Sequence, residues 1–599
     1  MPETMDVPAG TAPAAPQASA PDRLRRDQSA AKSLFVGSIL EENLFPYPKI
    51  RERDREILGS VVEAIDGFLA DKAGDFKTWD REAHQPEEFI QGLRDMGLFG
   101  LIIPEEHGGL ELSNGGYARV LSQTSTHDAS VSLTIGAHSS IGMKGILLYG
   151  TDAQKSQYLP ALASGESIAA FCLTESGSGS DAASIRTTAK LNPDGSWTLN
   201  GEKIWITNGG IAQVYTVFAR TEGTEGKITA FVVEAGWPGV SHGSHEDKMG
   251  IRASSTTVVG FADVRVPPEN VLGGEGKGFK VAMGILNSGR TGLGGGAVGG
   301  MKTLIRLATA QANERKQFGA PIARYGLVRE KIAQMTIDCF AAESTVWMLA
   351  HYIDSGVEDY ATEAAISKVF ASDAIQRCGQ EALQIAGGNG FMREYPYEQI
   401  VRDSRILSIF EGTNEILRLF IGLSGLKDAG NALEELKTAV DDIFNHPIKG
   451  FGMLSGYAGQ KLTQATGVGR DRIASRLPKD LADAQAVYEK YALELSSAAD
   501  FLLRKHGKSV VDRQYDLKRL ADVAIDLFVG LCTLSRAATL SAEGHAHSAQ
   551  AISIASLFSQ QAKRRMASNV RRLTRNEDAA MDALAGFSLE RGTYAWDVL

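Results

Sequence analysis

The chain has 599 residues, a net charge of -10, 43% hydrophobic residues and 22% charged residues. This length exceeds what one hydrophobic core usually supports, so several domains are expected, and the composition excludes a wholly disordered or fibrous chain. The acidic balance excludes a broad basic surface, so no nucleic-acid partner is predicted. The four cysteines, Cys172, Cys339, Cys378 and Cys532, form no cluster at metal-ligand spacing, which indicates free thiols and no metal site.

The first 33 residues are rich in Ala and Pro and carry Glu3 and Asp6. They contain no apolar core of a secretory signal, and the early acids argue against a mitochondrial presequence. No apolar run approaches the ~18 to 20 residues that span a bilayer. We expect residues 1–33 to be a flexible leader on a cytoplasmic protein.

A helical pattern follows over residues 34–168. Apolar residues recur there at helical spacing, at Leu58, Val61, Val62, Ile65, Phe68 and Leu69. Such a stripe is typical of an amphipathic helix. The segment is therefore predicted to be an N-terminal helical domain.

Residues 169–275 change to short β-rich runs. Turn signals such as Asn192-Pro193-Asp194-Gly195 and Asn200-Gly201 separate several of them. Because no helical pattern lies between these runs, they favour a mostly antiparallel β-domain over a parallel α/β sheet.

Helical periodicity returns after Gly276. One stripe consists of Met301, Leu304, Ile305 and Ala308, and a later one of Leu517, Leu520, Ala521, Ala524, Ile525 and Phe528. Long helices of this kind pack best as bundles. We predict a helical bundle over residues 276–426 and a helical extension over residues 427–599.

Gly294, Gly296 and Gly299 spell a GxGxxG fingerprint. A dinucleotide site needs this motif between a strand and a helix, whereas a helical pattern lies on both sides of it here. The glycines are better interpreted as permitting close helix packing or the close approach of a ligand. HExxH and GxxxxGK[ST] motifs are absent from the sequence, which disfavours zinc hydrolases and P-loop NTPases.

Four polar, small-residue segments stand at predicted element boundaries: residues 171–184 (FCLTESGSGSDAAS), 205–208 (WITN), 384–391 (QIAGGNGF) and 409–420 (IFEGTNEILRLF). Hydroxyls and exposed amides of this kind suit the heteroatoms or phosphates of a cofactor. Each segment taken alone also has an ordinary structural interpretation, namely a surface loop, a sandwich core, a helix C-cap and a solvated acid near a helix N-terminus.

Taken together, these segments resemble the acyl-CoA dehydrogenase family, whose enzymes introduce a trans α,β double bond into acyl-CoA thioesters. The resemblance extends from about residue 31 to the C-terminus. It is greatest to the very-long-chain members, through AHSSIGMKGILLYGT, GFKVAMGILNSGR and IFEGTNEILRLF. It implies a mainly α fold in which an N-terminal helical domain, a central β-barrel or sandwich and a four-helix bundle precede an extra C-terminal helical domain.

The resemblance also implies FAD as the cofactor. Matching contact positions are Phe171, Cys172, Leu173, Thr174, Gly179, Ser180, Trp205, Ile206, Thr207, Arg315, Gln317, Gln384, Ile385, Ala386, Gly387, Gly388, Thr413, Asn414 and Glu415. The hydroxyls of Thr174 and Thr207 would bond the isoalloxazine ring and tune its electronics. Trp205 would cover one face of that ring, and the guanidinium of Arg315 suits a pyrophosphate.

In the family's reaction a base removes the α-proton of the substrate while hydride leaves the β-carbon, and the matching base is Glu411. A carboxylate in an apolar pocket gains basicity through desolvation. Some relatives carry the base beside the arginine of the NSGR segment, where this chain has Gly289. Matching acyl-CoA contacts are Ser180, Asn287, Ser288, Gly289, Arg290, Phe410 and Gly412. For Arg290, an ion pair that holds the Glu411 loop is an equally weighted alternative.

The implied partners are a long-chain acyl-CoA, electron-transferring flavoprotein and a second copy of the chain that completes the FAD site. An acyl-CoA oxidase and a non-catalytic assembly or scaffold relative are the alternative functions. A non-catalytic relative would be expected to have lost the base or the flavin contacts, whereas this sequence keeps them. Residues 447–470 combine apolar and basic side chains and are predicted either to lie in a bilayer interface or to form a mobile loop. The preferred acyl length stays open, although Gly136, Ala137 and Gly142 are small where a deep pocket needs room.

Overall fold

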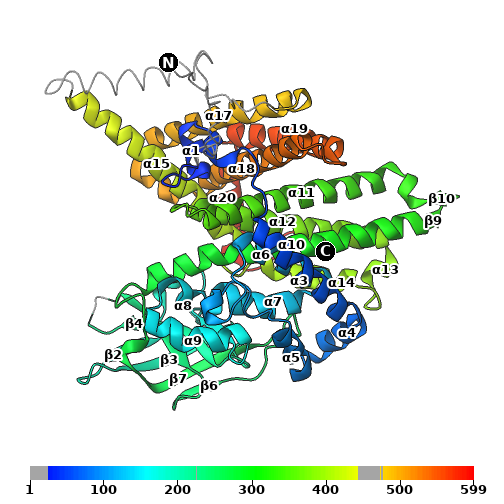
Figure 1. The fold of residues 1–599 in the computed structure, drawn as a ribbon. Coiled ribbons are helices and arrows are strands. Elements are labelled where there is room, and N and C mark those ends of the chain that lie inside the picture. Colours follow the sequence, from blue (N-terminus) through cyan, green and yellow to red (C-terminus); the bar gives the residue numbers. More distant parts are fainter. Residues whose placement is uncertain (1–23, 224–225, 443–472, 474–476, 599) are drawn as a thin grey trace, which may run out of the picture.

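The computed structural model describes residues 24–223, 226–442, 473 and 477–598. In Figure 1 the β-domain and most N-terminal helices lie at one end and long helices lie across the middle. The C-terminal helices lie at the other end, and the first helix of the chain lies beside them. One hydrophobic core joins the N-terminal helices from Leu58 onward to the β-domain. Another joins the segment from Ala30 to Tyr47 to the middle and C-terminal helices. The predicted fold class, a mainly helical chain with a central β-domain, is confirmed.

The N-terminal domain is helical, as predicted. Its helices are α1 (Ala30–Ser33), α2 (Glu41–Leu44), α3 (Glu52–Ala70), α4 (Ala73–Glu82), α5 (Glu87–Asp95), α6 (Asn114–His127), α7 (Ala129–Gly136), a π-helical turn (Ala137–Gly142), α8 (Lys144–Tyr149) and α9 (Asp152–Ser164). The predicted leader is wrong for its last residues. Ala30 and Ala31 are buried, and the Ser29 hydroxyl donates to Glu363 Oε1 at 2.6 Å, because these small residues fit against the helical core.

The β-domain contains β1 (Ala169–Cys172), β2 (Thr188–Leu191), β3 (Trp197–Thr207), β4 (Val214–Thr221), β5 (Ile228–Glu234), β6 (Val240–His242), β7 (Thr256–Val266) and β8 (Val271–Leu272). The sheet order is β6-β7-β3-β2-β4-β5-β8, with β1 beside β4. Its pairs are antiparallel except β1 with β4 and β2 with β4. The prediction of a mostly antiparallel domain is confirmed.

The middle helices are α10 (Gly278–Glu314), α11 (Gly326–Asp354), α12 (Ala361–Ala386), α13 (Gly388–Phe391), α14 (Tyr397–Arg405) and the start of α15 (Asn414–Asp442); a hairpin of β9 (Lys316–Gln317) and β10 (Ala320–Pro321) joins α10 to α11. The GxGxxG segment lies inside α10. A Cβ on Gly299 would stand 2.1 Å from Ser122 O, and one on Gly294 2.5 Å from Val346 Cγ2. These glycines permit close helix packing, as predicted.

Within the described residues, the C-terminal extension contains the rest of α15 and then α17 (Ala482–His506), α18 (Gln514–Ala542), α19 (Ser548–Arg572) and α20 (Asp578–Arg591). Helix α15 runs through the predicted boundary at residue 426 without a break, so that boundary falls inside a helix. By length and composition α18 could cross a bilayer, contrary to our expectation, but 83% of its most apolar window is buried in the protein. The predicted membrane segment, residues 447–470, lies outside the described residues.

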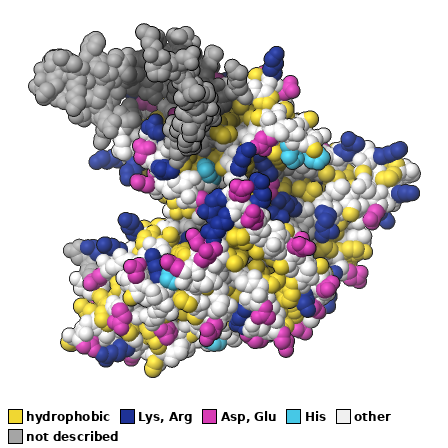
Figure 2. All heavy atoms as spheres, viewed as in Figure 1, with side chains coloured by type: hydrophobic (Ala, Val, Ile, Leu, Met, Phe, Trp, Pro, Cys, Tyr) yellow, Lys and Arg dark blue, Asp and Glu magenta, His cyan; other side chains and the backbone are white. Residues whose placement is uncertain are grey.

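The surface carries both signs of charge. Figure 2 shows basic and acidic side chains intermingled over the visible face, with apolar side chains between them. On this face the described residues form no continuous basic surface for a phosphate backbone.

Candidate active site

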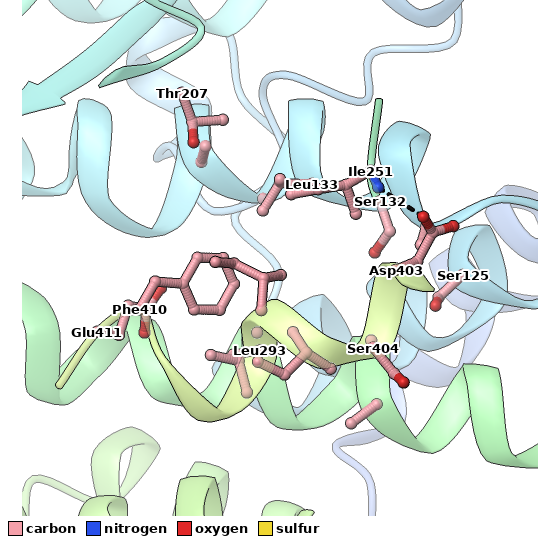
Figure 3. A pocket seen from close by; sticks show the side chains of 18 of the residues that line it. Ser125, Ser132, Leu133, Thr207, Ile251, Leu293, Asp403, Ser404, Phe410 and Glu411 are labelled. Atoms are coloured by element: carbon pink, nitrogen blue, oxygen red, sulfur yellow. Dashed lines mark hydrogen bonds between the residues drawn. The ribbon is translucent and has the colours of Figure 1, made fainter. Parts of the chain in front are cut away.

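A cavity of about 900 Å³ lies where the β-domain meets the helices. Helix α7 and the π-helical turn form one side, α10 and α14 form the other, and the ends of β1 and β3 close one flank. In Figure 3 Phe410 and Glu411 lie at one end, Ser125 and Asp403 lie at the other, and Leu293 lies between them. The predicted base thus lines an elongated, mostly apolar chamber.

The backbone at Glu411 is unusual. Glu411 and Gly412 have φ values of 55° and 92°, a left-handed conformation that is strained for a glutamate. Two buried cations hold the carbonyls of these residues. An Arg290 Nη donates to Glu411 O at 3.2 Å, and Lys368 Nζ donates to Gly412 O at 2.7 Å. The loop that carries the carboxylate is therefore fixed from both α10 and α12.

The electrostatics of Glu411 favour proton uptake. Its Oε2 is enclosed and has no hydrogen-bond partner among the described residues. Burial raises the pKa of the carboxyl, the charges of Arg290 and Lys368 lower it, and the net shift is upward. A carboxylate that is left unpartnered in an apolar chamber is more basic than a solvated one.

The contacts of Arg290 favour the interpretation in which it holds the loop. Its side chain is buried and donates to Asn287 Oδ1 at 2.7 Å as well as to Glu411 O. The second bond goes to the backbone carbonyl rather than to the carboxylate, which leaves the carboxylate free. Asn287 itself lines the cavity, so Arg290 also orients a predicted substrate contact.

Many of the predicted flavin contacts share one wall of the cavity, namely Phe171, Leu173, Thr174, Gly179, Ser180, Trp205, Ile206 and Thr207. The loop after β1 is fixed by Glu175, which accepts hydrogen bonds from buried Lys203 at 2.7 Å and from the Thr187 hydroxyl at 2.6 Å. The end of β3 is fixed by Asn208, whose Nδ2 donates to Thr134 O at 3.0 Å. This wall is therefore preformed.

The free groups of this wall fit an isoalloxazine ring. Trp205 is 64% exposed although it belongs to a strand, and its φ of 57° is left-handed. The hydroxyls of Thr174 and Thr207 line the same cavity, and neither forms a hydrogen bond to a described residue. An exposed indole beside unpartnered hydroxyls suits a flat aromatic system with polar edges.

The other predicted contacts do not line the cavity: Cys172, Ser288, Gly289, Arg315, Gln317, Gln384, Ile385, Ala386, Gly387, Gly388, Thr413, Asn414 and Glu415. Arg315, Gln317 and Gln384 lie on the surface instead. The side chain of Cys172 is fully buried, because strand residues alternate faces and its neighbours Phe171 and Leu173 take the cavity side. Asn414 is also buried and bonds Lys368 and Asp373, so its side chain supports the loop instead of facing a cofactor.

Small residues near the base have different roles. A Cβ on Gly289 would stand 3.0 Å from Ile141 Cγ2, so a side chain there would crowd the π-helical turn. Glycine also offers no carboxylate, so Glu411 has no rival at this position. Gly136 and Ala137 line the cavity. Gly142 does not, because a Cβ would stand 2.6 Å from Ala169 O, and its small size serves backbone packing.

The cavity follows one face of α10, along Asn287, Arg290, Leu293, Gly296, Ala297, Gly300, Thr303 and Arg306. The distance along the helix axis from Arg290 to Arg306 is about 24 Å at 1.5 Å per residue. An extended alkyl chain advances roughly 1.25 Å per carbon, given bonds of about 1.5 Å. The chamber therefore has room for a chain of about 16 to 19 carbons.

Lys368 is the functional residue that the sequence did not reveal. It lies in an otherwise apolar stretch of α12 and is fully buried. Burial lowers its pKa, and the Glu411 carboxylate is the first of the charges that raise it. A lysine between Ile366 and Val369 was the available signal, since lysine is almost never fully buried unless it is paired.

Family models match four stretches of the chain. Residues 55–166, 170–264 and 276–426 match the N-terminal, middle and C-terminal domains of acyl-CoA dehydrogenase, respectively. Residues 479–592 match the C-terminal domain described as ACAD9/ACADV.

Individual relatives agree with these matches. The chain is 46% identical over 528 residues to the very long-chain specific acyl-CoA dehydrogenase, mitochondrial, of Homo sapiens, covering 86% of this chain and 80% of the relative. An acyl-CoA dehydrogenase complexed with FAD from Bacillus anthracis superposes with a TM-score of 0.78 at 31% identity, covering 95% and 96% of the two chains. Butyryl-CoA dehydrogenase from Megasphaera elsdenii superposes with a TM-score of 0.60 at 37% identity, but covers 63% of this chain and 98% of its own. This shorter protein thus leaves over a third of the chain without a counterpart.

Proposed function

The chain belongs to the acyl-CoA dehydrogenase family, and on this premise we propose that Glu411 is the base of its reaction. The enzyme dehydrogenates acyl-CoA in fatty-acid β-oxidation, and its cofactor is FAD. The observation that carries the proposal is the enclosed Oε2 of Glu411, which has no hydrogen-bond partner among the described residues, in the wall of an elongated apolar cavity.

Glu411 takes the α-proton of the thioester on its carboxylate. Its raised pKa increases its basicity, and Phe410 beside it helps to exclude water from the reacting carbons. No described residue accepts a hydrogen bond from the Glu411 backbone N–H, so this donor is free for the thioester oxygen. A preorganised donor to a developing oxyanion contributes about 3 to 4 kcal/mol.

Bound FAD would supply the acceptor for the hydride that leaves the β-carbon. Thr174 and Thr207 would bond the polar edge of its ring, and Trp205 would cover one face. Asn287, Ser180 and Gly412 would hold the thioester and the start of the acyl chain.

Long- to very-long-chain substrates suit the chamber. Between Arg290 and Arg306 the α10 face is formed largely by glycine, alanine and leucine, and α7 adds Leu133. Each buried methylene contributes about 0.8 kcal/mol, so a chain that fills this length binds more tightly than one that stops near Leu293.

Anaerobic addition of palmitoyl-CoA to the yellow holoenzyme tests this function. We expect the flavin colour to bleach and trans-2-hexadecenoyl-CoA to form in equal amount. Re-oxidation should then be fast with electron-transferring flavoprotein and slow with oxygen. An enzyme that oxygen re-oxidises faster is an oxidase, and a protein that stays yellow is no dehydrogenase.

The rate should depend on pH through Glu411. As pH falls through its pKa, the carboxylate gains a proton and can no longer accept one, so kcat/KM should fall on the acid side. Because the pKa is raised, the midpoint should lie above that of an ordinary glutamate, about 4.3. A kcat/KM profile from about pH 5 to 9 with palmitoyl-CoA checks this; a flat profile would contradict it.

Exposed residues at the far side of the predicted FAD site favour a second copy of the chain as a partner. Arg315, Gln317 and Gln384 lie on the surface, and Phe318, next to Gln317 in the chain, is 95% exposed. A second copy of the chain would cover these residues in a homodimer with shared FAD sites. Electron-transferring flavoprotein as the acceptor, a cytoplasmic location and peripheral membrane contact through residues 447–470 rest on the sequence resemblance.

A further inference from the structure

The catalytic loop is tied to the C-terminal extension by a continuous path of polar contacts. The path begins at Lys368, whose Nζ donates to Gly412 O at 2.7 Å and to Asn414 Oδ1 at 2.9 Å. Asn414, the first residue of α15, donates in turn to Asp373 Oδ1 on α12 at 2.7 Å. Lys368 and Asn414 are both buried, so these bonds are shielded from water.

Arg418, one turn along α15, carries the path onward. Its Nη2 donates to Asp373 Oδ2 at 2.7 Å, and its Nε donates to Asp522 Oδ1 on α18 at 2.8 Å. The three side chains are 18%, 30% and 19% exposed, respectively. One guanidinium therefore bridges the four-helix domain and the extension with directional, charge-assisted bonds.

Backbone packing keeps α15 close to α18 at the same place. A Cβ on Gly422 would stand 2.9 Å from Leu517 O, so the two helices approach almost to backbone contact there. Gly422 lies one turn beyond Arg418. The start of α15, and with it the Glu411–Gly412 turn that directly precedes the helix, is therefore located relative to α18.

We infer that Asp522 and Arg418 are positioning residues of the dehydrogenase reaction, through which the C-terminal extension fixes the loop that carries Glu411. This inference rests on the proposed role of Glu411 as the base. Neither residue lines the cavity, so both act through Asp373, Asn414 and Lys368 and not on the substrate. The extension thereby contributes to catalysis in addition to enlarging the helical core.

The path acts on Glu411 through the charges that surround it. Arg290 on α10 and Lys368 on α12 are the cations that lower the pKa of Glu411, and Tyr117 on α6 also interacts with it. Loosening the Arg418 bridge frees Asn414 and with it the Lys368 ammonium. The carboxylate then loses part of its cationic stabilisation, and its pKa rises further.

The test is the Asp522→Ala holoenzyme assayed with palmitoyl-CoA. We expect kcat to fall about three- to tenfold, KM to change little and bound FAD to stay stoichiometric. The acid limb of the kcat profile should move up by about half a pH unit. Asp522→Glu, which keeps a carboxylate opposite Arg418, should restore much of the lost kcat and much of the shift in the acid limb. Lys518→Ala is the matched control, because Lys518 pairs with the other oxygen of Asp522 at 2.6 Å and is 58% exposed.

A purely structural role predicts a different outcome. Asp522→Ala would then lower the melting temperature while its kcat and the acid limb of its profile match those of wild type, and this result would overturn the inference. If Asp522→Ala does not fold, Arg418→Lys gives the same test, since an ammonium keeps the charge but cannot bridge two carboxylates in this geometry. Turnover by wild type is measured first, so failure of the inference is distinct from failure of the proposed function.

Discussion

Glu411→Gln holoenzyme is expected to dehydrogenate palmitoyl-CoA about 10²- to 10⁴-fold more slowly than wild type, the contribution of a positioned general base. Glutamine keeps the shape of the side chain but cannot accept the α-proton. The carbonyls of Glu411 and Gly412 that Arg290 and Lys368 hold belong to the backbone, so the loop should keep its conformation. FAD content and melting temperature should therefore change little, and kcat is the quantity to measure.

Glu166→Gln is the matched control for this variant. Glu166 is an exposed glutamate in the turn between α9 and β1 and does not line the cavity. The same chemical change there should leave kcat within about twofold of wild type, as expected for a surface substitution. If Glu411→Gln also kept wild-type kcat with bound FAD, Glu411 would not be the base.

Gly296→Leu is expected to shorten the acceptable acyl chain. Gly296 lies six residues beyond Arg290 on the cavity face of α10, about 9 Å or roughly seven carbons along the chamber. A Cβ there would stand 3.5 Å from Ser132 Oγ, so the first atom fits and the rest of the leucine must enter the cavity. If about four methylenes of the acyl chain can no longer be buried, and each contributes ~0.8 kcal/mol of binding free energy, kcat/KM for palmitoyl-CoA should fall about 10²-fold or more.

Hexanoyl-CoA is the internal control for this prediction. Its chain ends before Gly296, so its kcat/KM should stay near the wild-type value. Gly59→Leu, at an open position on α3, controls for replacing a helical glycine with leucine. An equal loss with both substrates would mean that Gly296→Leu disturbs the fold or the base, and that the acyl chain does not follow α10.

Local sequence patterns predicted the parts of this molecule that depend on neighbouring residues. Alternation and turn signals gave the β-domain, and the helical pattern around Gly294 excluded a dinucleotide site. The motif around Glu411 predicted a residue that does line the cavity.

The remaining features depend on tertiary contacts between distant residues. Gly412 and Lys368 are 44 residues apart in the sequence, and Arg418 and Asp522 are 104 residues apart. The type of a residue does not show which distant residue it will contact. The sequence left Arg290 either to substrate or to the loop, whereas the structure shows that it lines the cavity and also donates to Glu411 O. Gly142 and Gly136 look alike in sequence, yet only Gly136 lines the cavity, because strand β1 packs against Gly142.

Loss of the substrate α-proton to Glu411 is the central claim, and single-turnover flavin reduction by palmitoyl-CoA deuterated at C2 tests it most directly. Wild-type holoenzyme should bleach several-fold more slowly with the C2-deuterated thioester than with the unlabelled one, because the bond to that proton breaks in the step that the carboxylate assists. Equal rates with and without deuterium at C2, alongside a clear slowing by deuterium at C3, would contradict the account.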